Sequence, residues 1–244
     1  MRIDVEIIER ATVDGVVPAS VEEVPGWLLP FDSGTVGRAT SAVPLHHHWH
    51  EPSVIPEIIA RYEAKHLRPQ FRLPDTSNLG RLHALLGQRE FEPRRSSYVQ
   101  VIEAAPLTVR PLRADVSVAE AADSAWTAAF CAVPFGVKDQ VARAAALSRS
   151  PNTLYVSVRD KNQTVAVGAI TFARGLGCVH GMRTLTEHRG HGHAQRVLDA
   201  CARAALERRI QYLFLQVETE NQAARAAYKR AGFQTLWRYS YWHK

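Results

Sequence analysis

The seven residues HRGHGHA, from His188 to Ala194, combine three histidines with two glycines and allow two different chemistries. Histidine nitrogens bind transition metals, whereas glycines let consecutive backbone N–H groups converge on a phosphate. No cysteine or carboxylate stands at a typical ligand spacing from these histidines. The stretch therefore favours a phosphate-binding turn, and we expect no metal ion.

The flanking residues provide the context that such a turn requires. Residues 177–185 (GCVHGMRTL) predict a strand, and residues 194–209 (AQRVLDACARAALERR) predict a helix with one apolar face. A glycine turn between a strand and a helix places its N–H groups beside the positive end of the helix dipole. This arrangement can hold a pyrophosphate without a metal ion.

A second set of chemically useful residues follows the next predicted strand, residues 212–218. Asn221 stands at the N-cap of a helix predicted over 221–232, and Tyr228 lies two turns later on about the same helical face. Gly232 stands where the C-terminal cap of this helix is expected. A tyrosine hydroxyl held beside a reacting sulfur can give a departing thiolate its proton.

Together these motifs resemble the signatures of the GNAT superfamily of acyl-CoA-dependent N-acetyltransferases. The segment RGHGHA matches the Arg/Gln-x-x-Gly-x-Gly/Ala signature, and NQAARAAYKRAGF is similar to the second motif, Asn…Tyr…Gly-Phe. The resemblance covers about residues 107–244. It implies a mixed-sheet α/β acyltransferase fold and transfer of an acetyl group from acetyl-CoA to a primary amine, by direct attack in a ternary complex.

The resemblance also implies roles for particular residues. The backbone of Met182 and Thr184 would pair with the pantetheine arm, and a backbone N–H near Met182 would polarise the thioester carbonyl. Asn221 would contact the cofactor, and Tyr228 would be the acid for the thiolate. The N–H groups that would hold the pyrophosphate belong to Arg189, Gly190, His191, Gly192, His193 and Ala194.

The residue that accepts the proton of the attacking amine stays open on the sequence. His180 and Glu218 lie on predicted strands that flank the expected cleft, and either can accept a proton directly or through water. Strict alternation along the strand would put His180, Met182 and Thr184 on one side of it. A strand residue without a catalytic role is an equally good interpretation of His180 and of Glu218.

The remaining C-terminal segments predict further strands and helices. A strand is expected over 107–112, and a helix over 117–133 with Ser117 as N-cap and Glu120 completing a capping box. A second helix is expected over 138–150. The other expected strands are 153–160 and 164–175, joined by a turn at 161–163, and the final strand 233–242.

The first 105 residues resemble a weaker copy of the second half. The expected elements are paired strands over 26–34 and 35–45, a helix over 51–66, a strand over 69–74, a helix over 79–91 and a strand over 96–103. Phe71 and Phe91 are separated by about 20 residues, as are Phe214 and Phe233. We infer a degenerate internal duplication. Residues 1–105 would form a degenerate GNAT-like lobe and residues 106–244 the catalytic acetyltransferase domain.

In place of a glycine-rich turn, the first half carries HHHWH, from His46 to His50. By the resemblance, only the C-terminal lobe should therefore bind acetyl-CoA. An exposed loop is the first interpretation of these histidines, with a metal site as the alternative. Trp126, Phe130 and Phe135 are expected in the core, with an acceptor pocket as the alternative.

Composition limits the classes of protein that need to be considered. The 244 residues are 46% hydrophobic and 22% charged, which is typical of a soluble globular protein. No apolar run reaches the roughly 18 residues of a membrane span, and the charged N-terminus does not resemble a secretory signal. Three cysteines without paired spacing predict reduced thiols and a cytoplasmic location. The net charge of +6 fits a solubilising surface, without the basic stripe of a nucleic-acid-binding protein.

Two other functions stay open. The chain can be a CoA-binding regulatory module without turnover, or an N-acetyltransferase that acts on a protein lysine or N-terminus. We expect a small-molecule amine as acceptor, and neither a nucleic acid nor a membrane as partner. We also expect a monomer, because an internal duplication can replace the dimer that single-lobe relatives form.

Overall fold

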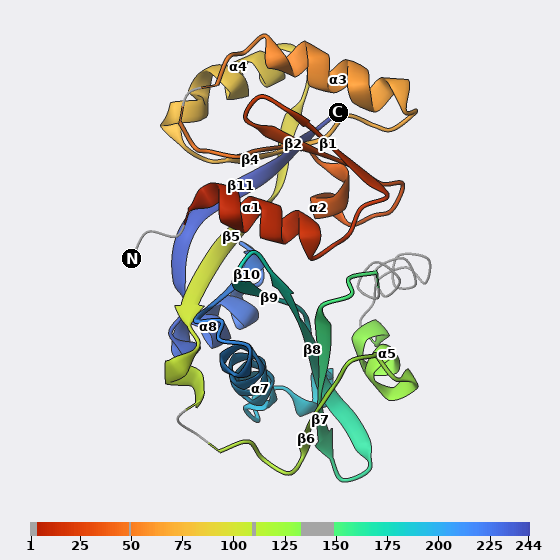
Figure 1. Ribbon diagram of the computed structural model, residues 1–244, viewed down its shortest axis with the longest axis vertical. Helices are drawn as coiled ribbons and strands as arrows, with labels where there is room; N and C mark the ends of the chain where they lie inside the picture. Colours follow the sequence, from red (N-terminus) through yellow and green to blue (C-terminus); the bar gives the residue numbers. More distant parts are fainter. Residues whose placement is uncertain (1–3, 49, 109–110, 133–148) are drawn as a thin grey trace.

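The computed structural model describes residues 4–48, 50–108, 111–132 and 149–244. Within these residues the strands form an eight-stranded and a three-stranded sheet, with helices packed against them (Figure 1). The helices are α1 (Val5–Asp14), α2 (Gly37–Thr40), α3 (Val54–Ala64), α4 (Gly80–Gln88), α5 (Ser124–Cys131), α7 (His193–Glu207) and α8 (Gln222–Ala231). The strands are β1 (Ser20–Val24), β2 (Trp27–Phe31), β3 (Val43–Pro44), β4 (Phe71–Pro74), β5 (Glu92–Glu103), β6 (Val116–Ala119), β7 (Thr153–Asp160), β8 (Gln163–Ala173), β9 (Leu176–Thr184), β10 (Tyr212–Glu218) and β11 (Gln234–His243).

The order of the strands is symmetric about a central pair, β5 and β11. The large sheet runs β4-β11-β5-β10-β9-β8-β7-β6, and the small sheet runs β1-β2-β3. A parallel bridge from Ala42 to Phe71 joins the small sheet to β4, as β9 pairs in parallel with β10 on the other side. The chain order α3–β4–α4–β5 recurs as α7–β10–α8–β11. The predicted mixed α/β fold is confirmed, and the symmetry supports the internal duplication.

Each half places its last strand in the other half. Strand β5, the last strand of the first half, pairs with β10 of the second half, from Glu103 opposite Tyr212 to Ser97 opposite Glu218. Strand β11, the last strand of the second half, pairs with β4 of the first half, from Tyr239 opposite Pro74 to Trp242 opposite Phe71. β5 and β11 also pair with each other along most of their length. The expected boundary between residues 105 and 106 therefore crosses one continuous sheet, and the division into two lobes stays a prediction.

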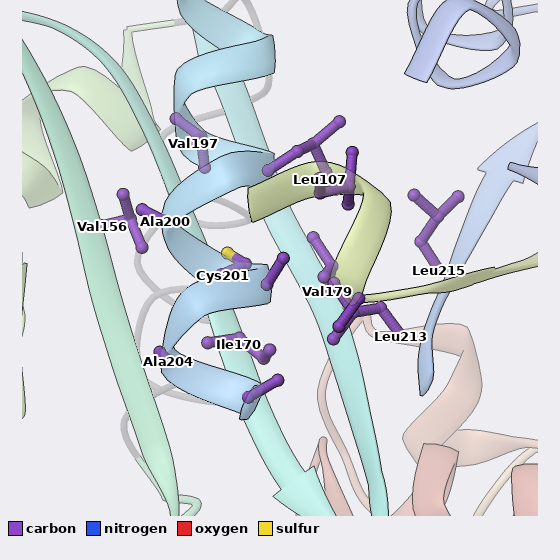
Figure 2. Packing of buried hydrophobic residues seen from close by; sticks show 14 of the residues in the cluster. Leu107, Val156, Ile170, Val179, Val197, Ala200, Cys201, Ala204, Leu213 and Leu215 are labelled. Carbon is purple, nitrogen blue, oxygen red and sulfur yellow. The ribbon is translucent and has the colours of Figure 1, made fainter. Parts of the chain in front are cut away.

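Helices cover both faces of the large sheet. On one face, α7 packs its apolar residues, Val197 and Cys201 among them, against the strands (Figure 2). On the other face lie α1 and α5, and in Figure 1 α5 and α7 flank β7 and β8 from opposite sides. Trp126 of α5 donates from its indole nitrogen to the carbonyl oxygens of Val156 and Gly168 at 3.1 and 3.2 Å. Trp126 is thus a core residue, as expected.

The unpredicted helix α1 connects the two halves. Its Glu9 forms a buried ion pair with Arg72 of β4, with 2.5 Å between carboxylate and guanidinium. Thr12, one turn later, accepts a hydrogen bond from the amide nitrogen of Gln216 in β10 at 3.0 Å. Because a buried charge without a partner is very costly, the Glu9–Arg72 pair ties α1 firmly to β4.

Two elements predicted in the second half, the strand over 107–112 and the helix over 117–133, differ from the structure. The described residues of the strand expected over 107–112 do not form one, since Ala105–Thr108 form a 3-10 turn and residues 111–112 have no regular structure. Ser117 lies in β6 and is not an N-cap, because this edge segment pairs with β7. The helix begins only at Ser124, where the Asp123 carboxylate accepts a hydrogen bond from the Trp126 N–H at 2.6 Å.

The segment 35–45 also differs from the expected strand. Residues 37–40 form the short helix α2, and only Val43–Pro44 pair with β2. Phe135 and nearly all of the second helix expected over 138–150 lie outside the described residues. The other expected elements are present with small shifts at their ends, including the strands and helices from β7 to β11.

Candidate active site

The two parallel strands at the centre of the candidate site separate part-way along their length. β9 and β10 pair only through Gly177–Leu213, Cys178–Phe214 and Val179–Leu215. Beyond this point β9 continues against β8 and β10 continues against β5. Within the described residues, the edge of β9 from His180 to Thr184 therefore has no strand partner on the β10 side, and its backbone groups can pair with a ligand.

A bulge in β9 lies at the start of this unpaired edge. The register against β8 shifts between Val167–Arg183 and Ala169–His180, so that Gly181 and Met182 stand opposite one residue, Gly168. Gly181 has the positive φ of +65° that favours glycine. Met182 consequently packs on the α7 face, whereas His180 points to the other face. The expectation that His180 and Met182 share one side is therefore wrong, and the bulge is the reason.

The glycine stretch forms an open turn at the start of α7. Gly190 and Gly192 have φ of +82° and +76°, and a Cβ built on either would meet no atom within 4 Å. Gly192 is the N-cap of α7, and no side chain caps the first N–H groups of this helix. Uncapped N–H groups in open space at the positive end of a helix dipole fit a pyrophosphate. The residues present therefore fit the diphosphate of CoA.

A positively charged pocket of about 310 Å³ lies beside this turn. Its lining residues are Arg113, Asp115, Arg159, Asp160, His188, His191, His193 and Arg196. Asp115 is bound by Arg113 at 3.2 Å and by Arg196 at 2.6 Å, which leaves an excess of cationic groups. These arginines were not expected from the sequence, because Arg113, Arg159 and Arg196 lie on segments that are distant in the chain. Among the described residues, no group of three histidine, cysteine or acidic side chains is arranged to hold a metal ion.

Tyr228 lies on the face of the sheet that α7 covers. Its ring is buried beside Phe233, with 5.7 Å between the ring centroids. Burial raises the pKa of Tyr228 to about 12, and the nearby charge of Arg183 on β9 acts in the opposite direction. The hydroxyl is therefore protonated at neutral pH.

Asn221 has the capping role that the sequence predicts. Its side-chain oxygen accepts a hydrogen bond from the Ala224 N–H at 3.1 Å, and Gly232 ends α8 with φ of +101°. This cap fixes the start of α8 and hence the position of Tyr228, two turns later. The side-chain oxygen of Asn221 is thereby engaged, so a cofactor contact would use its amide nitrogen.

The two candidate proton acceptors lie on the two strands that separate. His180 is buried, and its Nε2 lies 2.7 Å from Oγ1 of Thr171, while its Nδ1 has no hydrogen-bond partner among the described residues. Burial, with a smaller contribution from the charge of Arg38, lowers the pKa of His180 to about 3. Glu218 is exposed at the end of β10. The geometry thus brings both residues to the candidate site, and their roles stay predictions.

Comparison with protein families matches residues 3–242 to the family described as "Probable histone acetyltransferase Rv0428c C-terminal". The chain belongs to this family. Its fold is that of the GNAT acetyltransferases. An uncharacterized N-acetyltransferase, YobR of Bacillus subtilis (strain 168), is 29% identical over 91 residues, which are 37% of this chain and 37% of that relative.

Solved GNAT structures share the fold over the whole chain. A GCN5-related N-acetyltransferase from Kribbella flavida has a TM-score of 0.73 at 20% identity, over 98% of this chain and 95% of that chain. A tandem GNAT protein from the clavulanic acid biosynthesis pathway has a TM-score of 0.64 at 10% identity, over 97% and 87% of the two chains. The likeness to a tandem member agrees with the symmetric strand order.

In the first half, the histidines from His46 to His50 differ in burial: His50 is buried, His46 and His47 are half-buried, and His48 is exposed. His46, His48 and His50 stack, with ring centroids 3.7 Å apart for His46–His48 and 4.0 Å apart for His46–His50. His50 is buried and lies 5.2 Å from the Trp27 ring. The expectation of an exposed loop holds for His48 and is wrong for His50, which fills space beside Trp27. None of the helices in the described part of the chain is long and apolar enough to cross a membrane.

Proposed function

We propose that this protein transfers an acetyl group from acetyl-CoA to the primary amine of a small molecule in the cytoplasm. One observation carries the proposal. The unpaired edge of β9 leads to the open, uncapped glycine turn at the start of α7. Acetyl-CoA is a linear thioester with an amide-containing arm and a diphosphate. The unpaired edge of β9 can pair with the amides of the arm, and the glycine turn can bind the negatively charged diphosphate.

In the proposed complex, the N–H groups from Arg189 to Ala194 hold the diphosphate. The backbone of Met182 and Thr184 pairs with the pantetheine arm. A backbone N–H near Met182, at the bulge, donates to the thioester carbonyl oxygen and stabilises the negative charge that develops there. Met182 and Tyr228 pack on the same face of the sheet, which supports their acting on one thioester.

The proposed chemistry is a direct transfer. The amine nitrogen attacks the thioester carbonyl carbon, the carbon–sulfur bond breaks, and the thiolate takes the proton of the Tyr228 hydroxyl. The proton that the amine loses passes through water to Glu218. We favour Glu218 over His180 for this step, because a histidine whose pKa is about 3 is a weak proton acceptor at neutral pH.

A protein acceptor is the second candidate function. The family description names a probable histone acetyltransferase, which favours a lysine side chain as acceptor. A CoA-binding module without turnover is the third. Consumption of the acetyl-CoA thioester, screened with small amines, amino acids and basic peptides, distinguishes the three functions. Turnover with small amines alone is expected, and binding of acetyl-CoA without any turnover would contradict the proposal.

The binding site is tested by a pair of glycine variants. Gly192→Ala adds a methyl group to the proposed diphosphate cradle, whereas Gly175→Ala makes the same change in the turn between β8 and β9. Both glycines have φ near +75°, and both have open space around them, so the two variants carry the same backbone strain of about 1 kcal/mol. We expect the dissociation constant for acetyl-CoA, measured by calorimetry, to rise about tenfold in Gly192→Ala only. Equal affinities of the two variants would contradict the site.

A further inference from the structure

A cavity of about 660 Å³ lies between α8 and the central strands β5 and β11. Its volume falls in the range of small-molecule sites. The helix contributes Gln222, Arg225, Ala226 and Lys229, which follow one another at helical spacing and therefore share one face of α8. Tyr228, on the same helix, instead packs in the hydrophobic core. The cavity is thus lined by a different face of α8 from the one that carries the proposed proton donor.

Arg225 is held on the wall of the cavity by neutral groups. Its Nη1 donates to the carbonyl oxygen of Thr219 at 2.8 Å, and its guanidinium carbon lies 5.0 Å from the centroid of the Tyr98 ring on β5. A guanidinium has five N–H donors, so these two contacts leave donors for a ligand. Holding the side chain in place before binding reduces the entropy that a ligand must overcome.

The charge of the cavity favours an anion. Lys229 lies one turn beyond Arg225 on the same face of α8, and its side chain is exposed. The described residues that line the cavity include these two cations and no acidic side chain. None of these lining residues belongs to the glycine turn at the start of α7. The cavity is therefore a cationic site of its own, apart from the proposed diphosphate cradle.

Gln100 on β5 provides a buried acceptor on the strand side of the cavity. The residue is only 7% exposed, and its amide nitrogen donates to Oγ1 of Thr235 on β11 at 3.0 Å. Its Oε1 is buried and has no hydrogen-bond partner within the described residues. A buried acceptor without a donor costs free energy, and an N–H group of a ligand in the cavity would remove this cost. The ring of Phe233 adds an apolar surface to the same wall.

We propose that this cavity binds a small organic oxyanion, a carboxylate or a phosphate monoester, whose aromatic body carries an N–H donor. The oxyanion pairs with Arg225 and Lys229, because the planar N–H pairs of a guanidinium match both kinds of oxyanion. The N–H group donates to Gln100, and the aromatic body packs against Phe233. The site goes beyond the proposed acetyltransferase function, and its ligand contacts the helix that carries Tyr228.

The test measures binding of two probes to the full-length protein by calorimetry. Indole-5-carboxylate represents the carboxylates and AMP the phosphate monoesters, and all titrations contain excess CoA so that the proposed cofactor site is filled. We expect at least one probe to bind about tenfold more tightly than its neutral counterpart, indole-5-carboxamide or adenosine. The probe that shows this preference identifies the oxyanion. If neither probe binds more tightly than its neutral counterpart, the inference is overturned.

A matched pair of variants places the bound probe in the cavity. Lys229→Gln and Arg230→Gln each remove one positive charge from neighbouring exposed positions of α8, but only Lys229 lines the cavity. We expect the dissociation constant of the probe to rise about threefold in Lys229→Gln and to stay unchanged in Arg230→Gln. Arg225→Gln should raise it about tenfold. Equal affinities of the Lys229→Gln and Arg230→Gln variants would exclude the cavity as the site.

The role of Gln100 is tested with benzofuran-5-carboxylate, in which an oxygen replaces the N–H group of the indole. The wild type should bind the indole about fivefold more tightly than the benzofuran, and Gln100→Leu should bind the two equally. An indole preference that persists in Gln100→Leu would contradict the proposed hydrogen bond.

Discussion

Tyr228 has the ionisation state that a proton donor to a thiolate requires. Its buried hydroxyl, with a pKa of about 12, stays protonated at neutral pH. A thiolate is a strong enough base to take a proton from a positioned hydroxyl, and such proton transfers contribute about 100-fold to rate or more. The buried environment of Tyr228, as well as its place in the motif, therefore supports a role as proton donor.

Replacing Tyr228 with phenylalanine tests this role. Tyr228→Phe removes only the hydroxyl, and we expect kcat to fall about 100-fold while the affinity for acetyl-CoA changes little. Tyr212→Phe is the matched control, because it removes an exposed hydroxyl that lies 3.4 Å from Glu103 on β5. Steady-state kinetics and calorimetry measure the two quantities. An unchanged kcat in Tyr228→Phe would exclude this tyrosine as the acid.

Three histidines of the first half, His46, His47 and His50, make the stability of the fold sensitive to pH. Burial lowers the pKa of His47 to about 4, and burial also lowers the pKa values of His46 and His50. The unfolded chain, with ordinary histidine pKa values near 6.5, therefore binds more protons than the folded chain. The stabilising effect is fully present above about pH 6.5 and is lost as the pH falls toward about 4.

Urea unfolding at pH 7 and pH 5 measures this loss. For His47 alone we expect the free energy of unfolding to fall by about 1–2 kcal/mol. His47→Phe keeps the ring that packs edge-on against Trp237 and should show a smaller pH dependence than the wild type. His66→Phe, at an exposed position on the same half, is the control and should behave like the wild type. A His47→Phe variant with the full pH dependence would contradict the assignment.

At the scale of elements, α5 shows how one cap decides where a helix begins. Asp123 accepts a hydrogen bond from the Trp126 N–H, and Ser117 lies in β6 opposite Ser157. We expect Asp123→Ala to lower the free energy of unfolding by about 1 kcal/mol, because the first turn of α5 loses its acceptor. Ser117→Ala, at an exposed strand position, should have an effect below about 0.5 kcal/mol. Urea unfolding of both variants checks this, and the reverse order of effects would contradict the observed helix start.

At the scale of the whole molecule, the two halves are joined through β5 and β11. Each of these strands completes the sheet of the other half, and Glu9 of α1 is paired with Arg72 of β4 in the interior. A fragment of residues 106–244 therefore lacks β5, the strand that lies between β10 and β11 in the sheet. Such a fragment exposes unpaired strand edges that promote aggregation.

We expect neither residues 1–105 nor residues 106–244 to fold alone. Co-expressed, the two fragments should co-purify as one complex, because all the strand pairs can then form. Circular dichroism and calorimetry measure whether each sample has a cooperative thermal transition. A cooperative transition of isolated 106–244 would show that the C-terminal half is an independent domain and would confirm the expected boundary.

The sequence by itself determined the local features of this protein. The glycine turn, the Asn221 cap and the helix that carries Tyr228 depend on residues within one or two turns of each other, so their spacing in the chain predicts their structure. The repeated order of strands and helices likewise predicted the duplication. The same local information misplaced the start of α5, because capping and edge-strand signals compete over a few residues.

Only the tertiary structure decided which distant residues meet. The bulge at Gly181 turns His180 and Met182 to opposite faces, and it forms because β9 must fit against β8 while leaving β10. The exchange of β5 and β11 brings Gly37 of α2 against Tyr241 of β11, far away in the chain. Pairing between strands depends on burial and register across the whole sheet, and the sequence of one segment does not contain that information.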